Sequence, residues 1–141
     1  MLGRLALMAL LVVSGLGCGP RDRSMDLKDA VRDYNRSLRW NAFQRASRYV
    51  EQSKRGAWLA GRNSSAGGLH ITDIHTVRLQ KPDFTQKTVE VLVSVSWYRL
   101  PDSTIRTAVW SQTWQEIDAR WRIIEEKQVE VTGETEAPQW P

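Results

Sequence analysis

The sequence has very little cysteine and histidine: one cysteine, Cys18, and two histidines in 141 residues. A single cysteine cannot form a disulfide within the chain. No uninterrupted apolar run reaches the roughly 20 residues that a helix needs to cross a bilayer. The sequence also lacks a glycine-rich phosphate loop, a nucleophile motif, an internal repeat and a low-complexity tract. These absences exclude a disulfide scaffold, disfavour a permanent membrane helix, and argue against most catalytic classes.

The N-terminal segment has the order of a secretory signal peptide: one positive charge, an apolar run over residues 5–13, and a short flexible stretch. Directly after it, Gly17 and Cys18 resemble the end of a bacterial lipoprotein signal, in which a small residue precedes the cysteine that becomes lipidated. Such signals usually have leucine three positions before the cysteine, where this chain has Gly15. The resemblance implies lipid attachment at Cys18. The alternative is an ordinary secreted signal that leaves a free thiol.

The lipoprotein resemblance also implies a location. Each buried methylene of an acyl chain such as palmitate contributes about 0.8 kcal/mol to membrane attachment. Gly19 follows the cysteine, which implies sorting to the outer membrane. We therefore expect a lipid-anchored protein of the bacterial cell envelope that faces the periplasm. Its expected partners are the membrane and an envelope protein, and nucleic acid is not expected there despite the net charge of +4.

The chain divides into a signal peptide and one domain of ordinary size. We predict a signal peptide at 1–17, the lipidated cysteine and a polar tether at 18–26, a single domain at 27–131 and a loose tail at 132–141.

Helical periodicity begins at Asp26. Apolar residues at spacings of four, three and four share one helix face: Leu27, Val31, Tyr34 and Leu38. A second helix is expected after Asn41, which is a plausible N-cap, with a buried stripe of Phe43, Ala46, Tyr49 and Val50. Residues 54–61 add a short third turn, and 61–68 have the composition of a loop.

The periodicity then changes to two, which predicts strands. Apolar residues occupy alternate positions from Val89 to Trp97, which predicts a strand. Residues 100–103 are expected to form a turn, and residues 104–117 the returning strand. Pairing Arg99 with Thr104 places Val93 opposite Trp110 and Val89 opposite Trp114. Further strands are expected at 69–79, bulged near Asp73, and at 121–131 after a tight turn at 118–120.

The order of elements predicts an α+β fold, with N-terminal helices packed on a curved four-stranded antiparallel sheet. This arrangement resembles the cystatin-like, or nuclear-transport-factor-two-like (NTF2-like), cone. More closely, it resembles small uncharacterised bacterial lipoproteins through Tyr34, the "LRW" at 38–40, the "QTW" at 112–114 and the "RW" at 120–121. The resemblance implies a fold and a location, but no activity.

Four aromatic residues are candidates for the lining of a ligand pocket: Tyr34, Trp97, Trp110 and Trp114. Seven tryptophans are many for so small a chain. The same side chains suit a filled core equally well.

Few residues suit catalysis or metal binding. Asp73 and His75 lie two apart on a strand and could share a face, so that together with Tyr34 they are the candidates for an enzyme site. His70 and His75 are five apart and are expected on opposite faces, which disfavours a metal site. We therefore expect no metal, no cofactor and no enzymatic activity.

Basic residues exceed acidic ones over residues 19–62, and acidic residues exceed basic ones over 63–141. Arg32, Arg36 and Arg39 fall on one helix stripe and form a candidate basic surface that could meet anionic head groups. The alternative is a solvated helix face in which Asp29 and Asp33 pair with arginines three residues later.

The leading hypothesis is therefore a non-enzymatic interaction module held at the membrane. The second is a periplasmic-facing pocket protein for a small apolar ligand, and the third is a hydrolase- or isomerase-like enzyme on the same fold.

Overall fold

The computed structural model describes residues 22–83 and 85–129. Its helices are α1 (Arg23–Arg39), α2 (Phe43–Ala46), the short 3₁₀ helix η1 (Ser47–Tyr49) and α3 (Arg55–Ser65). Its strands are β1 (Leu69–Leu79), β2 (Thr88–Arg99), β3 (Asp102–Ile117) and β4 (Arg120–Val129). The predicted signal peptide, Cys18 and the tail at 132–141 lie outside the described residues. None of the helices in the described ranges is long and apolar enough to cross a membrane.

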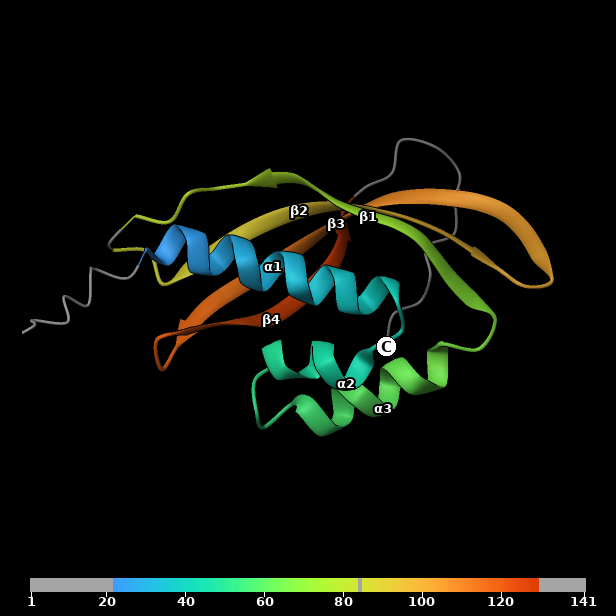
Figure 1. Ribbon diagram of the computed structural model, residues 1–141, viewed down its shortest axis with the longest axis horizontal. Helices are drawn as coiled ribbons and strands as arrows, with labels where there is room; N and C mark the ends of the chain where they lie inside the picture. The colour runs from blue at the N-terminus through green and yellow to red at the C-terminus, as the bar shows by residue number, and fades with distance from the viewer. Residues whose placement is uncertain (1–21, 84, 130–141) are drawn as a thin grey trace, which may run out of the picture.

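The four strands form one antiparallel sheet in the order β1-β2-β3-β4. Helix α1 crosses this sheet and contacts both of its edge strands, while α2 and α3 lie beside it (Figure 1). The predicted α+β class, with N-terminal helices on a four-stranded antiparallel sheet, is confirmed.

The predicted register between β2 and β3 is confirmed at its centre, where Val89 pairs with Trp114 and Val93 with Trp110. It is wrong at the turn, because Arg99 pairs with Asp102 and not with Thr104. An irregularity after Trp97 shifts the pairing there. The apolar alternation fixes the central register, but it cannot detect an irregularity outside the buried part of the strands.

Three further irregularities shape the sheet, one of them between Thr76 and Arg78 in β1. The expected bulge in β1 is present between Ile71 and Asp73. The third lies in the β3–β4 pair between Thr113 and Trp114, and beyond it Gln112 pairs with Glu126. Because this bulge shifts the β3–β4 register, the polar residues Gln112 and Glu126 face each other, whereas a regular sheet would pair Gln112 with a different residue.

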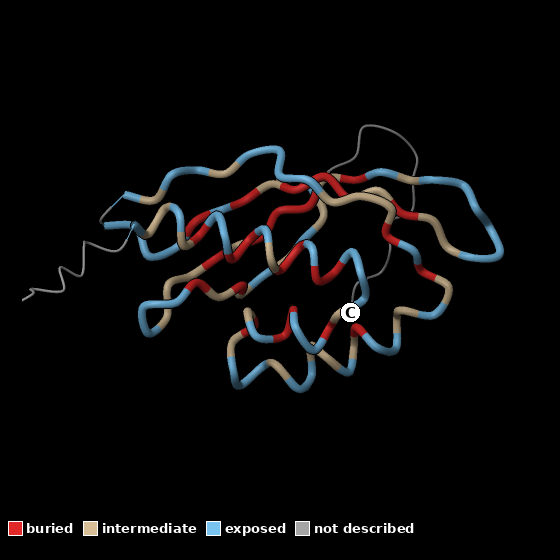
Figure 2. Tube along the Cα trace, viewed as in Figure 1, coloured by how far each residue is buried: buried red, intermediate tan, exposed pale blue. Residues whose placement is uncertain are grey.

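The core fills the space between α1 and the sheet. The predicted helix stripe from Leu27 to Leu38 is buried, as is the alternating set from Val89 to Trp97. Figure 2 shows this buried layer, with exposed residues along the outer edges and at the far end of the β2–β3 hairpin. Trp114 packs edge-on against Tyr34, with ring centroids 5.5 Å apart.

The first helix begins earlier than its apolar periodicity predicts. Asp22 caps it by accepting hydrogen bonds from the backbone N–H groups of Ser24 and Met25. Residues 23–26 of the predicted tether are therefore helical.

Asn41 ends α1 and does not cap the second helix, so that prediction is wrong. It follows the C-cap residue Trp40 and has φ 53°. Asparagine tolerates this left-handed conformation, which is common just after a helix. The N-cap position of α2 is Ala42, which makes no side-chain cap hydrogen bond.

Helix α3 extends to Ser65, so residues 61–65 of the predicted loop are helical instead. The hydroxyls of Ser64 and Ser65 donate back to the carbonyl of Gly61, which lets serine occupy a helix. Arg62 is anchored from the same turn by an ion pair to Glu126 on β4. This tertiary contact outweighs the loop-forming composition.

Candidate functional site

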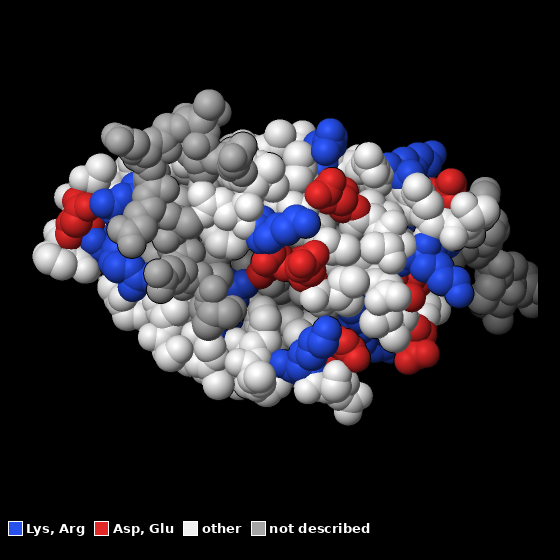
Figure 3. Space-filling view, turned by 180° about the vertical axis from the view of Figure 1, so that it is seen from behind, with Lys and Arg blue, Asp and Glu red and all other residues white. Residues whose placement is uncertain are grey.

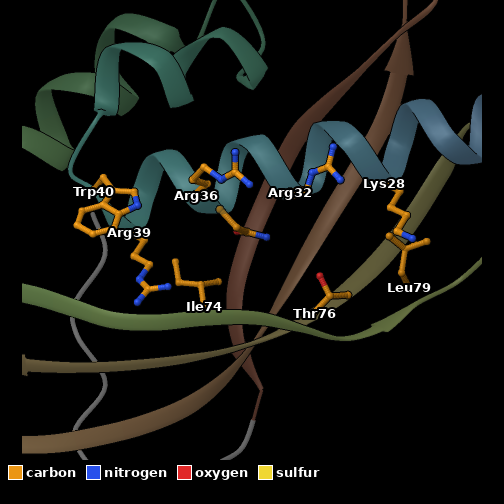
Figure 4. Close-up of a pocket in the computed structure, with 9 residues that line it drawn as sticks. Lys28, Arg32, Arg36, Arg39, Trp40, Ile74, Thr76 and Leu79 are labelled. Carbon is orange, nitrogen blue, oxygen red and sulfur yellow. The ribbon is translucent and has the colours of Figure 1, made fainter.

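A hollow of about 590 Å³ lies between α1 and β1 (Figure 4). Its lining residues come from two segments: Lys28, Arg32, Asn35, Arg36, Arg39 and Trp40 from α1 and its C-cap, and Ile74, Thr76 and Leu79 from β1. Lys28 reaches toward Leu79 at one end, and Arg39 reaches toward Ile74 at the other (Figure 4). We call this hollow the α1–β1 hollow. Its volume lies within the range of small-molecule sites.

The wall formed by α1 is cationic. Lys28, Arg32, Arg36 and Arg39 recur at spacings of four, four and three, which places them along one edge of the helix. All three residues of the predicted basic surface are among them.

These cations are only partly neutralised. Arg32 pairs with Asp29 at 2.8 Å, as the alternative of a solvated helix face predicts. Asp33 does not pair with Arg36 as that alternative expects, because its ion pair is with Arg45. Within the described ranges, Lys28 and Arg36 form no ion pair with a carboxylate. The α1–β1 hollow therefore keeps an excess of positive charge.

The opposite wall of the hollow is largely apolar. Ile74 and Leu79 belong to the side chains that pack against the core, and Trp40 is 71% exposed at one end. The guanidinium carbon of Arg39 lies 5.5 Å from the centroid of the Trp40 ring, within cation-π range. The hollow thus combines cations along the α1 wall with hydrocarbon on the β1 wall and an indole at one end, on the C-cap of α1.

The opposite side of the molecule has a different charge pattern. Seen from behind, basic and acidic side chains lie in neighbouring groups (Figure 3). Neighbouring opposite charges largely cancel at a distance, so this view offers no comparable stripe of one sign.

The four predicted pocket residues lie in the core. Tyr34 and Trp114 are fully buried, and Trp97 and Trp110 are nearly so. Trp110 also lines a second hollow of about 160 Å³, together with Trp58 and Arg62. Tyr34, Trp97 and Trp114 line neither this second hollow nor the α1–β1 hollow. Their geometry is that of the filled core, which the sequence left as the alternative.

A buried polar network begins at the floor of the α1–β1 hollow. Asn35 lines the hollow, and its Oδ1 accepts a hydrogen bond from Nε2 of Gln112 at 2.7 Å. The same Nε2 donates to Glu126 at 3.2 Å, and Trp114 Nε1 donates to Oε1 of Gln112 at 3.4 Å. Glu126 in turn forms the ion pair with Arg62. The network thus links α1, β3, β4 and α3 through the interior.

Tyr34 lies beside this network. Burial raises the pKa of its phenol well above the ordinary value, and the negative charge of Glu126 raises it further. Arg62 is only 3% exposed, and its guanidinium carbon lies 5.0 Å from the Trp58 ring centroid. Tyr34 therefore remains a neutral phenol, and Arg62 is held as a buried cation.

The three candidate residues for an enzyme site, Asp73, His75 and Tyr34, do not come together in the structure. The side chains of Asp73 and His75 are at least half exposed on β1, with Nδ1 of His75 3.0 Å from Asp73. Tyr34 is buried on the side of α1 that faces the core. His70 stacks on Tyr98 and takes no part. Among the residues that the structure describes, no cluster of histidine, cysteine or carboxylate side chains could hold a metal ion.

Comparison with known proteins gives a fold and no family. No protein-family model matches the chain. No curated protein matches it either.

Solved structures share the fold at low sequence identity. A SEC-C motif containing protein from Rhodopseudomonas palustris has a TM-score of 0.62 at 8% identity, covering 76% of this chain and 81% of that one. An NTF-2 like protein of unknown function from Shewanella oneidensis has a TM-score of 0.55 at 15% identity, covering 74% and 96%. An LEH-like epoxide hydrolase from M. tuberculosis has a TM-score of 0.55 at 11% identity, covering 71% and 82%. The chain thus shares its α+β fold with NTF2-like proteins.

Sequence reasoning missed the β1 wall of the hollow and the whole buried network. Gln112 gave a signal, because it occupies a core position of the alternation between Trp110 and Trp114. Asn35 gave a weaker signal, as a polar residue that directly follows Tyr34 of the buried helix stripe. Glu126 gave none, since its inward position depends on the bulge in the β3–β4 pair.

Proposed function

We propose that this protein is a lipid-anchored, non-enzymatic binding protein of the bacterial cell envelope that holds an anionic amphiphile in the α1–β1 hollow. The observation that carries the proposal is the composition of this one hollow, with four cations along α1 facing an apolar wall on β1. An acidic head group would lie against Arg36 and Lys28, and an apolar chain would lie against Ile74 and Leu79.

Charge and hydrocarbon together explain the choice of ligand. A charge-assisted hydrogen bond to a cation stabilises a complex by about 1.5–3 kcal/mol. An isolated cation stripe without apolar surface would suit any soluble anion. The apolar wall and Trp40 instead favour a ligand with a hydrocarbon part. The structural neighbours share the fold at 8–15% identity, so the choice of ligand rests on the hollow alone.

The envelope location rests on the N-terminal sequence, in particular on Gly17, Cys18 and Gly19. Anchoring at the outer membrane would place the hollow close to a supply of acidic amphiphiles. The protein-interaction module that leads the sequence-based hypotheses stays a prediction. Its test is crosslinking in intact cells, which should retain an envelope partner.

Isothermal titration with two matched amphiphiles tests the ligand class. Octyl phosphate and octanol share the hydrocarbon chain and differ in charge. We expect octyl phosphate to bind at least about tenfold more tightly, which corresponds to about 1.4 kcal/mol. Equal affinity for the two compounds would overturn the anionic part of the proposal.

Variants then assign binding to this hollow. Arg36→Gln should weaken octyl phosphate by about tenfold and leave octanol unchanged, because it removes one charge-assisted contact. Ile74→Asn should weaken both compounds, because it disrupts the apolar wall. Arg106→Gln, on β3 outside the hollow, is the control for lost positive charge. If Arg36→Gln and Arg106→Gln behaved alike, the ligand would bind elsewhere.

The anchor has a separate test. Cys18→Ser should release the protein from a membrane fraction washed at high salt, which screens contacts between charges and leaves an acyl anchor in place. Continued association of this variant at high salt would contradict lipidation at Cys18.

A further inference from the structure

A second basic surface lies on the other side of α1. An open groove of about 610 Å³ is formed where α1, η1 and the start of β4 meet. Six arginines and three aspartates are among its lining residues. Three of these arginines come from outside α1 and α2, and we call them the rim arginines: Arg48 on η1, and Arg120 and Arg122 on β4.

None of the rim arginines forms an ion pair with a carboxylate in the described ranges, and Asp118 acts on Arg122 only through its charge. Two of the three aspartates that line the groove pair with other arginines, since Asp33 pairs with Arg45 and Asp29 with Arg32. Asp33 also accepts a hydrogen bond from the Tyr49 hydroxyl at 2.8 Å. The fold therefore gathers three guanidinium groups from two separate segments without pairing any of them with a carboxylate in the described ranges.

The cluster is partly ordered and is under charge repulsion. Arg122 donates a hydrogen bond to the carbonyl of Arg48, which fixes its position. Burial lowers the pKa of Arg122, and the positive charges of Arg55 and Arg120 lower it further. An anion placed among these residues would relieve that repulsion at little cost in side-chain ordering.

The position of the cluster identifies the source of the anion. Trp121, between Arg120 and Arg122, donates from Nε1 to the carbonyl of Arg23 at 3.2 Å. Arg120 and Arg122, at the start of β4, therefore lie near the start of α1 beside the β3–β4 turn (Figure 1), and Arg122 is hydrogen-bonded to Arg48 on η1. Only the stretch 19–21 separates Cys18 from the N-cap Asp22. Four extended residues span at most roughly 14 Å, so a lipid on Cys18 would hold this end close to the bilayer.

We propose that the rim arginines Arg48, Arg120 and Arg122 dock on the phosphate head groups of anionic membrane lipids. This surface is distinct from the α1–β1 hollow, although Arg32 and Arg36 line both. The choice of a bilayer lipid over soluble phosphate as the ligand rests on the lipid anchor of the proposed function. The existence of the groove does not depend on that anchor. Docking would orient the domain on the membrane and would place the α1–β1 hollow at a fixed height above it.

Vesicle co-sedimentation of the Cys18→Ser protein tests this docking without the lipid anchor. We expect binding to vesicles of phosphatidylcholine mixed with phosphatidylglycerol, and none to phosphatidylcholine alone. Each basic residue near an anionic surface contributes about fivefold in affinity. The double variant Arg48→Gln/Arg120→Gln should therefore bind about twenty- to thirtyfold more weakly. Both side chains are exposed, so the fold should tolerate the change.

Two control variants carry the same loss of charge. Arg106→Gln/Lys127→Gln changes exposed or partly exposed residues outside the groove and should bind vesicles almost as well as the parent. Lys28→Gln/Arg39→Gln changes only the α1–β1 hollow and should weaken octyl phosphate while leaving vesicle binding intact. An equal loss in all three doubles would reduce the effect to net charge and overturn the proposal.

The remaining outcomes are also decisive. Absence of vesicle binding by the parent would overturn the docking surface, whether or not Cys18 is lipidated. Binding of inorganic phosphate that the Arg48→Gln/Arg120→Gln variant abolishes, without vesicle binding, would overturn the membrane as the occupant. If the wild-type protein proved to carry no lipid on Cys18, vesicle binding would still support the docking surface, and only the anchor would be contradicted.

Discussion

The buried ion pair between Arg62 and Glu126 offers the sharpest energetic test of the interior. Only 3% of the Arg62 side chain and 15% of the Glu126 side chain are exposed. Removing one member leaves the other as a charge poorly reached by water, which costs about 3–5 kcal/mol. We therefore expect Arg62→Met and Glu126→Gln each to lower the free energy of unfolding by about 3 kcal/mol. Urea denaturation followed by tryptophan fluorescence measures this loss.

The double variant separates a buried pair from two independent packing losses. Without either charge no isolated ion remains, so the double should cost about 2–3 kcal/mol less than the sum of the singles. The exposed pair Asp29–Arg32 is the control, and its removal should change stability by less than about 1 kcal/mol. Single variants that each cost under about 1 kcal/mol, with additive effects in the double, would refute this account of the network.

Three further predictions concern stability. Trp114→Ala should cost about 3–5 kcal/mol because the side chain is fully buried, and Trp40→Ala, at 71% exposed, should cost under about 0.5 kcal/mol; similar losses in urea titrations would contradict the placement of these rings. Burial, followed by the hydrogen bond to Asp33, raises the pKa of Tyr49 from 10.0 to about 12. A pKa that is raised in the folded state gives stability that is present below pH 10 and is lost toward pH 12. The urea midpoint of the wild-type protein should therefore fall across this pH range, and that of Tyr49→Phe should fall less. Identical falls would exclude the Tyr49 phenol as the cause. Asp22→Ala should cost about 1 kcal/mol by removing the N-cap of α1, as the urea midpoint would show, and no change would mean that Asp22 does not cap the helix.

Periodicity was sufficient to predict the fold class and the central sheet register. The alternation from Val89 to Trp97 permits only one pairing with Trp110 and Trp114 that buries both apolar sets. The errors lie where a single residue or a single contact determines the backbone conformation. Asn41 takes a left-handed conformation, and a tertiary ion pair from Arg62 extends α3 through a serine- and glycine-rich stretch.

The site was only half predictable. Arg32, Arg36 and Arg39 share a helix stripe, and helical spacing alone is enough to group them. The facing wall of Ile74, Thr76 and Leu79 depends on which strand lies beneath α1, and a pattern within one strand does not contain that information. Helix α3 and strands β1 to β3 separate residue 48 from residue 120 in the sequence, so the rim arginines meet only once the chain has folded.

Native mass spectrometry of the protein released from its own membrane in mild detergent tests the central claim most directly. We expect the wild-type protein to carry the added mass of a small acidic amphiphile, beyond polypeptide and anchor lipid. The same preparation of Ile74→Asn should lack that mass, and Arg106→Gln should retain it. A wild-type protein that carries no such addition, or one whose addition persists in Ile74→Asn, would contradict a ligand in the α1–β1 hollow.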